Sequence, residues 1–293
     1  MYLRGLIRSF LLLALLASLL ALAACGDDDE EGDGGGSPAV TEEANGGGGE
    51  IDISGVPELE DGVLNIGSDI AYAPIEFYQE GTETPDGLDV DLANAMADAM
   101  GVEAEFLNTG FDGIIESLNT DEFDVIFSAM TINPEREQEI DFVPYVQVGT
   151  GILVPAGNPD GIAAVEDLCG LTVAVQLGTI QETLLQEQNE SCTEKMEIVT
   201  FDTNPLAVED VRTAGSDANL SDFPVAYIDA EESNGELEAL DVQIDPAPYG
   251  IGVRKSSTEL KSVLEQALDA IIESGAYDEI IDKWSPVAGS IER

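Results

Sequence analysis

The sequence predicts an α/β protein made of two units. The chain has 293 residues, which is enough for one large or two ordinary domains. From Val63 onward, short apolar stretches alternate with amphipathic stretches, and this alternation restarts near Gly151. Alternating strand and helix signals are typical of domains with a largely parallel sheet. Each unit would contain about a hundred residues, an ordinary domain size.

The first unit begins with an expected strand at residues 63–68. A helix is expected at 89–100, and Gly101 ends it because glycine readily takes the left-handed conformation found after helices. The other expected elements of this unit are a strand at 102–107, a helix at 111–118 and a strand at 123–129.

The second unit repeats this order of elements. Strands are expected at 151–154, 171–175, 196–200 and 225–228, with helices before Cys169, at 181–188 and from Asn204 onward. Two further helices are expected at 258–275 and 277–284. The first of them carries one apolar stripe typical of a core-facing helix, formed by Leu260, Val263, Leu264, Ala267, Leu268, Ile271 and Ile272.

The composition excludes several classes of function. The chain carries 10 basic and 60 acidic residues, a net charge of -50, and no histidine. Nucleic acid is excluded as a partner because phosphate binding needs clustered cations. Histidine metal sites and acid–base catalysis by imidazole are excluded too, and we expect no cofactor and no metal ion. Dissolved salt would screen the self-repulsion, so we expect a salt-adapted organism.

Residues 1–24 have the features of a signal peptide. Arg4 and Arg8 precede an apolar run at 10–22 that is short for a membrane span. The run ends in LAAC, which resembles the bacterial lipobox, where the cysteine, here Cys25, becomes the lipidated first residue. A plain signal peptide near a cysteine is the alternative. We expect residues 25–61 to form an acidic, glycine-rich tether, ordered sequence to begin near Val63, and the protein to be extracytoplasmic and lipid-anchored to the cell membrane.

Two cysteines remain after Cys25, namely Cys169 and Cys192. An even pair in an oxidising compartment favours a disulfide. Such a bridge would close a loop of about 24 residues and stabilise the fold by about 3 kcal/mol. Two buried free thiols are the alternative.

The stretch DVIFSAMTINPER at 124–136 is the strongest candidate for a binding site. Asn133 is expected to cap a helix that begins at Pro134, which places Arg136 in the first turn, where the helix dipole disfavours a cation. Arg136 is also the only Lys or Arg between Arg8 and Lys195. A lone guanidinium near hydroxyl groups suits a small carboxylate ligand. The alternative is an ion pair with Glu137, Glu139 or Asp141.

Three further loops follow expected strands, at the sheet edge where ligands of open α/β sheets bind. Their sequences are GSDIAYAP at 67–74, QLGTIQ at 176–181 and YID at 227–229. Together with residues 128–136, they would supply one cation, two carboxylates, hydroxyls and aromatic faces. This set matches a zwitterion that carries an α-carboxylate and an α-ammonium group.

A series of motifs connects the chain to a known family. In order they are GSDIAYAPIEF, GLDVDLANAMADAMG, FDGIIESLNTDEFDVIFSAMTINPER, DFVPY, LTVAVQLGTIQET, VAYID, YGIGVRK and YDEIIDKW. From about Leu64 to Pro286 the chain resembles the family 3 extracellular solute-binding proteins, the polar-amino-acid receptors of ABC importers.

The resemblance implies a fold and a domain organisation. The fold is the two-lobed, type II periplasmic-binding-protein fold, with two hinge strands and a ligand cleft between the α/β lobes. Lobe 1 would comprise residues 62–148 and 248–293, and lobe 2 residues 149–247. The placement of Cys169 and Cys192 resembles that in actinobacterial members with a disulfide there.

The resemblance also implies roles for individual residues. Arg136 would hold the ligand carboxylate, with hydrogen bonds from Ser128, Ala129 and Thr131. Lobe 2 would add Thr179 and the backbone of Ile180 to the carboxylate, and Asp229 to the α-ammonium. Residues 212–224 form a longer segment than the family's turn before the last lobe-2 strand, so the register of Asp229 stays open.

Four more residues would surround the ligand side chain. Tyr72 and Phe111 would enclose it, and Asp69 and Gln176 would line its far end. Core packing is the alternative for the two aromatic residues, and an ordinary turn is the alternative for Asp69 and Asp229. Asp69 with Tyr72 favours a ligand side chain that ends in hydrogen-bond donors.

The function that follows from the resemblance is transport. A monomer without catalytic residues would capture a polar or basic L-amino acid, of the glutamine, arginine, lysine or histidine type, and deliver it to an ABC permease. The alternatives are a cleft enzyme on the same fold, such as a dehydratase or lyase, and an extracellular ligand-sensing domain.

Overall fold

The computed structural model describes residues 51–284. The expected signal peptide, Cys25 and the tether up to residue 50 lie outside the described residues. Residues 51–61, assigned above to the tether, are folded and contain the 3₁₀ turn η1 (Pro57–Leu59). Val56 and Leu59 are buried in the core beside β1 (Val63–Ser68), because residues three apart lie on one side of a 3₁₀ turn. The expectation that ordered sequence begins near Val63 is therefore wrong.

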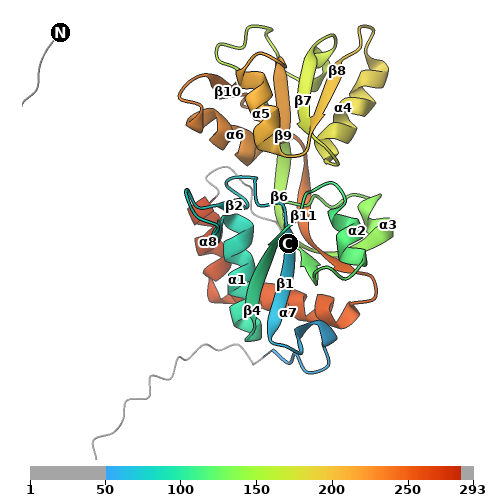
Figure 1. Cartoon of the computed structure of the whole chain (residues 1–293), viewed down its shortest axis with the longest axis vertical. Coiled ribbons are helices and arrows are strands. Elements are labelled where there is room, and N and C mark those ends of the chain that lie inside the picture. The colour runs from blue at the N-terminus through green and yellow to red at the C-terminus, as the bar shows by residue number, and fades with distance from the viewer. Residues whose placement is uncertain (1–50, 285–293) are drawn as a thin grey trace, which may run out of the picture. The chain divides into compact units, whose positions relative to one another are not determined.

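Two α/β lobes are joined by two long strands that run through both (Figure 1). These strands are β6 (Ile140–Pro155) and β11 (Ile244–Arg254), which pair antiparallel. At one end β11 pairs with β5 (Val125–Ile126), and at the other end β6 pairs with β9 (Ala218–Asp222). The predicted two-lobed architecture with two hinge strands is confirmed. The expected lobe limits, near residues 148 and 248, fall within these two strands.

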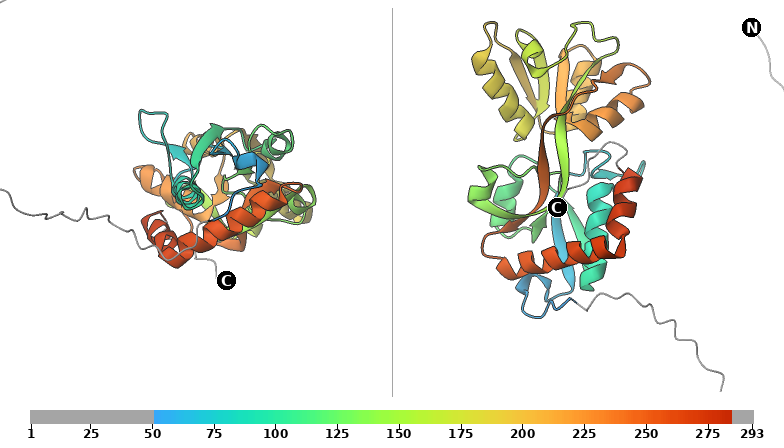
Figure 2. Two further views of the ribbon diagram at one scale, coloured as in Figure 1. Left: turned by 90° about the horizontal axis from the view of Figure 1, so that it is seen from below. Right: turned by 180° about the vertical axis from the view of Figure 1, so that it is seen from behind.

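Lobe 1 has helices on both faces of its part of the sheet (Figure 2). Its strands follow the order β4 (Glu103–Asn108), β1, β5 and β11, with the first three parallel. One face is covered by α1 (Leu88–Met100), α7 (Thr258–Ser274) and α8 (Ala276–Trp284), and the other by α2 (Ile114–Asn119). A small hairpin pairs β2 (Phe77–Tyr78) with β3 (Pro85–Asp86).

Lobe 2 repeats this layered arrangement. Next to β6 and β9 lie β7 (Thr172–Gln176) and β8 (Glu197–Phe201), which are parallel, while β10 (Leu237–Ala239) pairs with β6. One core cluster includes Leu185 of α4 (Ile180–Ser191), and a second joins α5 (Asn204–Arg212) to α6 (Phe223–Glu232).

Local sequence explains where the main helices begin and end. α1 follows Gly87, where a Cβ atom would lie 2.3 Å from the carbonyl oxygen of Ile75, so no larger residue fits. Gly101 and Gly275 end α1 and α7 in the left-handed conformation. The predicted stripe of α7 is buried except for Ile272, which is partly buried.

One predicted element is wrong in type. Residues 225–228, expected to be a strand, lie within α6, whose first turn contains Pro224, a favoured residue there. The strand of this region is instead β9, which lies directly before α6 and is buried throughout although three of its residues, Asn219, Ser221 and Asp222, are polar. A buried polar strand lacks the apolar signal that identifies a strand in the sequence.

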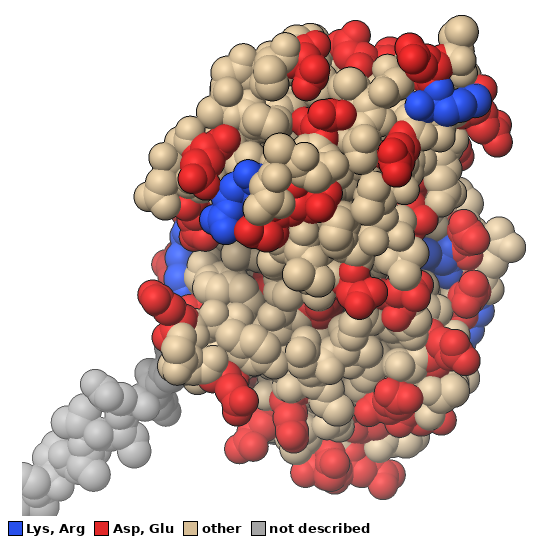
Figure 3. Space-filling model, turned by 45° about the horizontal axis from the view of Figure 1, so that its top comes forward, with Lys and Arg blue, Asp and Glu red and all other residues tan. Residues whose placement is uncertain are grey.

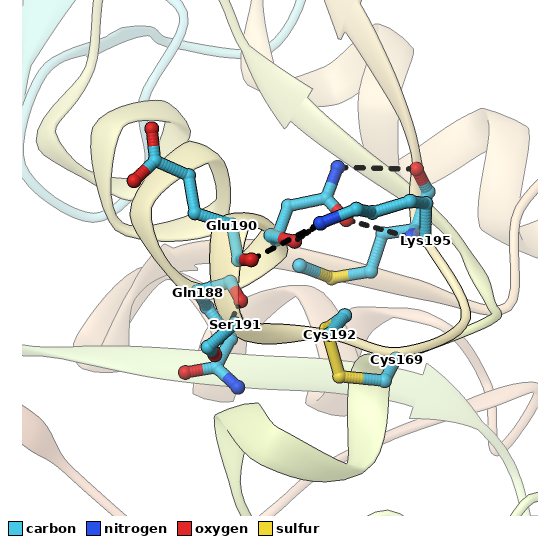
Figure 4. The surroundings of a disulfide bond; sticks show 8 residues. Cys169, Gln188, Glu190, Ser191, Cys192 and Lys195 are labelled. Carbon is cyan, nitrogen blue, oxygen red and sulfur yellow. Dashed lines mark hydrogen bonds between the residues drawn. A yellow bond between two sulfur atoms is a disulfide. The ribbon is translucent and has the colours of Figure 1, made fainter.

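A disulfide joins Cys169 and Cys192, as predicted, and the alternative of two free thiols does not hold (Figure 4). The bridge connects the residue after η2 (Val165–Leu168) to the residue after α4. Beside it, the Lys195 ammonium donates to the carbonyl oxygens of Asn189 and Glu190, at 2.6 and 3.1 Å. A cation at this end of α4 is favoured by the helix dipole.

Acidic side chains are spread over the surface. The face seen in Figure 3 shows many Asp and Glu residues and few Lys and Arg, in keeping with the net charge of -50. Salt will therefore affect the stability of this chain, because added ions screen repulsion between exposed like charges.

Candidate functional site

A cavity lies between the two lobes. Lobe 1 contributes Asp69, Tyr72, Glu76, Phe111, Ser128, Ala129, Thr131 and Arg136, and lobe 2 contributes Gln176, Thr179, Ile180, Gln181 and Asp222. About 310 Å³ in and around it is free of protein atoms. The cavity is therefore lined by residues of both lobes, so a ligand bound in it would contact both.

The cavity brings together every predicted ligand-binding residue except Asp229. Three of its residues were not among the predicted site residues: Glu76, Gln181 and Asp222. Glu76 follows the buried Ile75, and an acid within an apolar stretch was the signal that could have revealed it. Gln181 belongs to a loop that was singled out, but as a helix residue it carried no signal of its own. Asp222 lies in the segment read as a long turn.

Arg136 is the central cation of the site, with only 8% of the residue exposed. Its Nη1 donates to the carbonyl oxygen of Thr131 at 2.7 Å, and its Nη2 donates across the cleft to that of Gly178 at 3.1 Å. The guanidinium carbon lies 5.3 Å from the centre of the Phe111 ring, a cation–π distance.

The local fold explains how Arg136 reaches this position. The side chain of Asn133 accepts a hydrogen bond from the Arg136 backbone N–H at 2.8 Å. The helix α3 (Arg136–Glu139) begins later than the expected Pro134, and its N-cap is Glu135 instead of the expected Asn133. Burial lowers the pKa of Arg136 to about 10, against the raising effect of the charges of Asp222 and Glu135, so the guanidinium stays charged at neutral pH.

The suggested ion pair of Arg136 with a nearby carboxylate is not formed. Within residues 51–284 the guanidinium has no salt bridge, and the carboxylate of Asp141 contacts Lys255 and Lys261 instead. A buried cation without an ionic partner is costly unless its hydrogen bonds are satisfied. The site therefore contains a desolvated positive charge available to an anionic group.

Four direct hydrogen bonds among the described residues connect the lobes at this cavity. Besides the Arg136–Gly178 bond, Gln176 Nε2 donates to Asp69 Oδ2 at 2.6 Å. The Tyr72 hydroxyl donates to Asp222 Oδ2 at 2.9 Å and accepts from the backbone N–H of Asp222 at 2.9 Å. Gly178 also lies close to Asp112 of lobe 1, since a Cβ atom on it would be 3.3 Å from the Asp112 carboxylate. The structure thus has its lobes in contact.

The loop at 128–131 is held from behind by buried groups. Ala129 has a positive φ of 46°, and its N–H donates to Asp89 Oδ2 at 2.8 Å. Asp89 in turn accepts from the Tyr145 hydroxyl at 2.7 Å. Burial raises the pKa of Asp89 to about 7, although both hydrogen bonds lower it. These bonds fix an unfavourable backbone conformation so that the loop faces the cavity.

Ser128 links two acidic residues of the cavity. Its hydroxyl accepts from the backbone N–H of Asp69 at 2.9 Å and donates to Glu76 Oε1 at 3.1 Å. Burial raises the pKa of Asp69. Burial also raises the pKa of Glu76 well above its usual value, and the negative charges of Asp89 and Asp69 raise the pKa of Glu76 further. Burial also raises the pKa of Asp222 to about 6, against hydrogen bonds from tyrosine and glutamine side chains.

Asp229 is not at the cavity, and its expected place at the end of the last lobe-2 strand is wrong. It lies on α6, because residues 223–232 form a helix where a strand was expected. Its Oδ2 accepts from Asn204 Nδ2 at 3.1 Å. Burial raises the pKa of Asp229 to about 7, opposed by this hydrogen bond. The acidic residue at the end of a lobe-2 strand is instead Asp222, the last residue of β9.

The described chain shows no features of membrane spanning or of a metal site. Among residues 51–284, none of the helices combines the length and the apolar character that a membrane crossing requires. The same residues contain no group of three or more His, Cys, Asp or Glu side chains placed to hold a metal ion.

Residues 64–287 match the family described as "Bacterial extracellular solute-binding proteins, family 3". The chain belongs to this family. The L-cystine-binding protein TcyJ of Escherichia coli is 29% identical over 226 residues, covering 77% of this chain and 83% of that protein. The arginine-binding extracellular protein ArtP of Bacillus subtilis is 31% identical over 228 residues, covering 75% and 85%.

Solved structures agree with the family assignment. An ancestral arginine-binding protein bound to arginine has a TM-score of 0.73 and 34% identity, covering 76% of this chain and 98% of the other. The ancestral amino acid-binding protein AncCDT-1, described as a precursor of cyclohexadienyl dehydratase, has a TM-score of 0.71 and 37% identity, covering 77% and 96%. The predicted fold and family are therefore confirmed.

The raised pKa of Asp229 predicts a change in stability with pH. Between its ordinary value of 3.8 and about 7, the folded state keeps a proton that the unfolded chain has lost, so this group destabilises the fold as pH rises. Asp229→Asn cannot ionise. The unfolding free energy of the variant minus that of the parent should therefore be larger at about pH 7.5 than at about pH 4.5. Urea unfolding in high salt at the two pH values measures this difference. The matched control is Asp160→Asn, at an exposed position. An equal difference at both pH values would contradict the prediction.

Proposed function

We propose that this chain is the extracytoplasmic substrate-binding lipoprotein of an ABC transporter. It captures a polar or basic L-amino acid, of the glutamine, arginine, lysine or histidine type, by closing its two lobes, and delivers it to a permease. The observation that carries the proposal is the buried Arg136 guanidinium without a salt-bridge partner among the described residues, facing a cavity with Asp222 on the opposite lobe. The names of the relatives support it, because they include cystine-, arginine- and histidine-binding proteins.

The ligand carboxylate binds at Arg136. A guanidinium presents paired N–H donors that fit a carboxylate. Thr131 lies beside it in lobe 1, and Thr179 with the backbone of Ile180 faces it from the start of α4. The first amides of a helix have no partner within the helix, so the Ile180 N–H is a further donor.

The α-ammonium group binds at Asp222, which takes the role first given to Asp229. Asp222 is buried, accepts from Tyr72 and Gln181, and carries a negative charge once its proton is lost. Ser128 and Ala129 line the same cavity. Tyr72 and Phe111 enclose the ligand side chain, and Asp69 and Gln176 lie at its far end.

Closure follows from the division of these groups between the lobes. Neither lobe alone can satisfy both the carboxylate and the ammonium group. A ligand that bonds to both lobes therefore shifts the equilibrium toward the closed form, which is the only form with all the contacts. The hinges are β6 and β11, because these strands connect the lobes.

The remaining parts of the proposal concern location. A signal peptide at 1–24 is removed, Cys25 receives the lipid, and the acidic segment up to residue 50 connects the anchor to the folded part. The protein acts as a monomer on the outer side of the cell membrane, where a permease receives the ligand.

A cleft enzyme is the second candidate. It is favoured by one observation, the likeness to a protein described as a precursor of a dehydratase, and the cavity contains acids that could transfer protons. Incubation with each amino acid that binds separates the two candidates. A binding protein returns the amino acid unchanged, and an enzyme does not.

Arg136→Ala should abolish ligand binding. A thermal-shift screen of the twenty amino acids in high salt should find at least one polar or basic amino acid that raises the melting temperature of the parent protein. In Arg136→Ala that rise should vanish, because the loss of a buried charged partner costs about 3–5 kcal/mol, or more than about a hundredfold in affinity. Arg212→Ala, which removes an exposed arginine outside the cavity, should respond like the parent. A normal response from Arg136→Ala would rule out the carboxylate assignment.

Asp222→Asn and Asp229→Asn should differ sharply in affinity. Loss of the Asp222 charge should weaken binding by about 2 kcal/mol or more, because a buried ammonium loses its counter-ion. Asp229→Asn should change the dissociation constant by less than about threefold, since Asp229 lies outside the cavity. Titration calorimetry with the amino acid found by the screen measures both. The reverse order of effects would return the ammonium site to Asp229.

A further inference from the structure

Glu76 is a buried acid with one unused oxygen. The residue is 1% exposed and lines the cavity between the lobes. Its Oε1 accepts from the Ser128 hydroxyl, whereas its Oε2 has no hydrogen-bond partner among the described residues. An unsatisfied carboxylate oxygen in a buried position is expensive and calls for a donor. The cavity that Glu76 faces is where such a donor could come from.

The groups around Glu76 make the cavity strongly acidic. The carboxylates that face it are Asp69 at the end of β1, Asp89 on α1 and Asp222 at the end of β9. The phenol groups of Tyr72 and Tyr145 are also close to it. Arg136 is the one cation among the residues that line the cavity. Three lining carboxylates, Asp69, Glu76 and Asp222, therefore face a single positive charge.

A charge count shows what kind of ligand balances the site. If, as proposed above, Arg136 binds the ligand carboxylate and Asp222 its ammonium group, Asp69 and Glu76 remain without a partner of opposite charge. A neutral side chain leaves both uncompensated, and one of them must keep a proton. Asp69 accepts from Gln176, which favours its charged form, whereas Glu76 has one hydroxyl donor and several acidic neighbours. The proton therefore resides on Glu76.

We propose that Glu76 selects a ligand with a cationic side chain, such as arginine or lysine, and releases its proton when that ligand binds. The inference rests on the proposed function, and it narrows the ligand class to basic amino acids. The side-chain cation lies between Asp69 and Glu76 and donates to Glu76 Oε2. The proton leaves Glu76 for solvent, so the closed site exchanges one positive charge for another. A neutral side chain of the same shape displaces no proton from Glu76.

The test compares L-arginine with L-citrulline, which has nearly the same shape but a neutral urea group. Calorimetric titrations in two buffers of different ionisation enthalpy give both the affinity and the number of protons released. Both ligands carry an ammonium group that can displace a proton from Asp222. The difference in proton release between the two ligands therefore reports on the end of the ligand side chain. The parent protein should bind L-arginine at least about tenfold more tightly and release up to about one more proton with it.

Glu76→Gln should reduce the preference for L-arginine about tenfold and remove the extra proton release, while L-citrulline binding changes less than about threefold. Asp124→Asn, at a carboxylate of lobe 1 outside the cavity, is the matched control and should keep the preference. If Glu76→Gln does not fold, the proton count of the parent decides. Equal affinity and equal proton release for the two ligands, or an unchanged preference in a folded Glu76→Gln, would overturn the inference and leave the proposed function intact. Failure of every amino acid to bind the parent would overturn the proposed function itself.

Discussion

The structure depends on one buried positive charge held between two lobes. Arg136 is desolvated, donates to a carbonyl group of each lobe and has no salt bridge within the described chain. Its position is fixed by the hydrogen bond from its backbone N–H to the Asn133 side chain and by the Phe111 ring. Such a charge is costly unless an anion shares the site, and the carbonyl groups satisfy only part of its donor capacity. The fold provides this arrangement because two hinge strands bring a loop of each lobe to one cavity.

The acidic groups around this cation give the cavity its second property. Asp69, Glu76 and Asp222 face a single arginine, and Asp89 lies behind them, where it holds the backbone of Ala129. Burial raises the pKa of each acid, so protons as well as hydrogen bonds balance the charge. A ligand with separate anionic and cationic groups can replace both these protons and these hydrogen bonds. Because the charged groups that it contacts lie on both lobes, such a ligand favours closure of the lobes.

Most of the fold and much of the cavity could be predicted from the sequence. The strand at 63–68 and the helix ended by Gly101 follow from apolar patterning and a glycine cap, which are local signals. The strand β9 could not be found in this way, because Asn219, Ser221 and Asp222 are buried polar residues. The partners of Asn219 and Asp222 come from distant segments, on β7 and α4. Because β9 was not recognised, the acidic site residue at the end of a lobe-2 strand was predicted to be Asp229, whereas it is Asp222. Glu76 was missed because its importance depends on neighbours brought together only by the fold.

The distance between the lobes is the most direct test of the account. Spin labels on Glu116→Cys in lobe 1 and Gln186→Cys in lobe 2, both at exposed positions, would report it in a Cys25→Ser background. Addition of the amino acid identified by the thermal-shift screen should change a broad distance distribution into a narrow, shorter one, because the ligand bonds to both lobes. In Arg136→Ala the distribution should stay broad. An unchanged distribution in the parent at saturating ligand would contradict the claim that binding closes the lobes around Arg136.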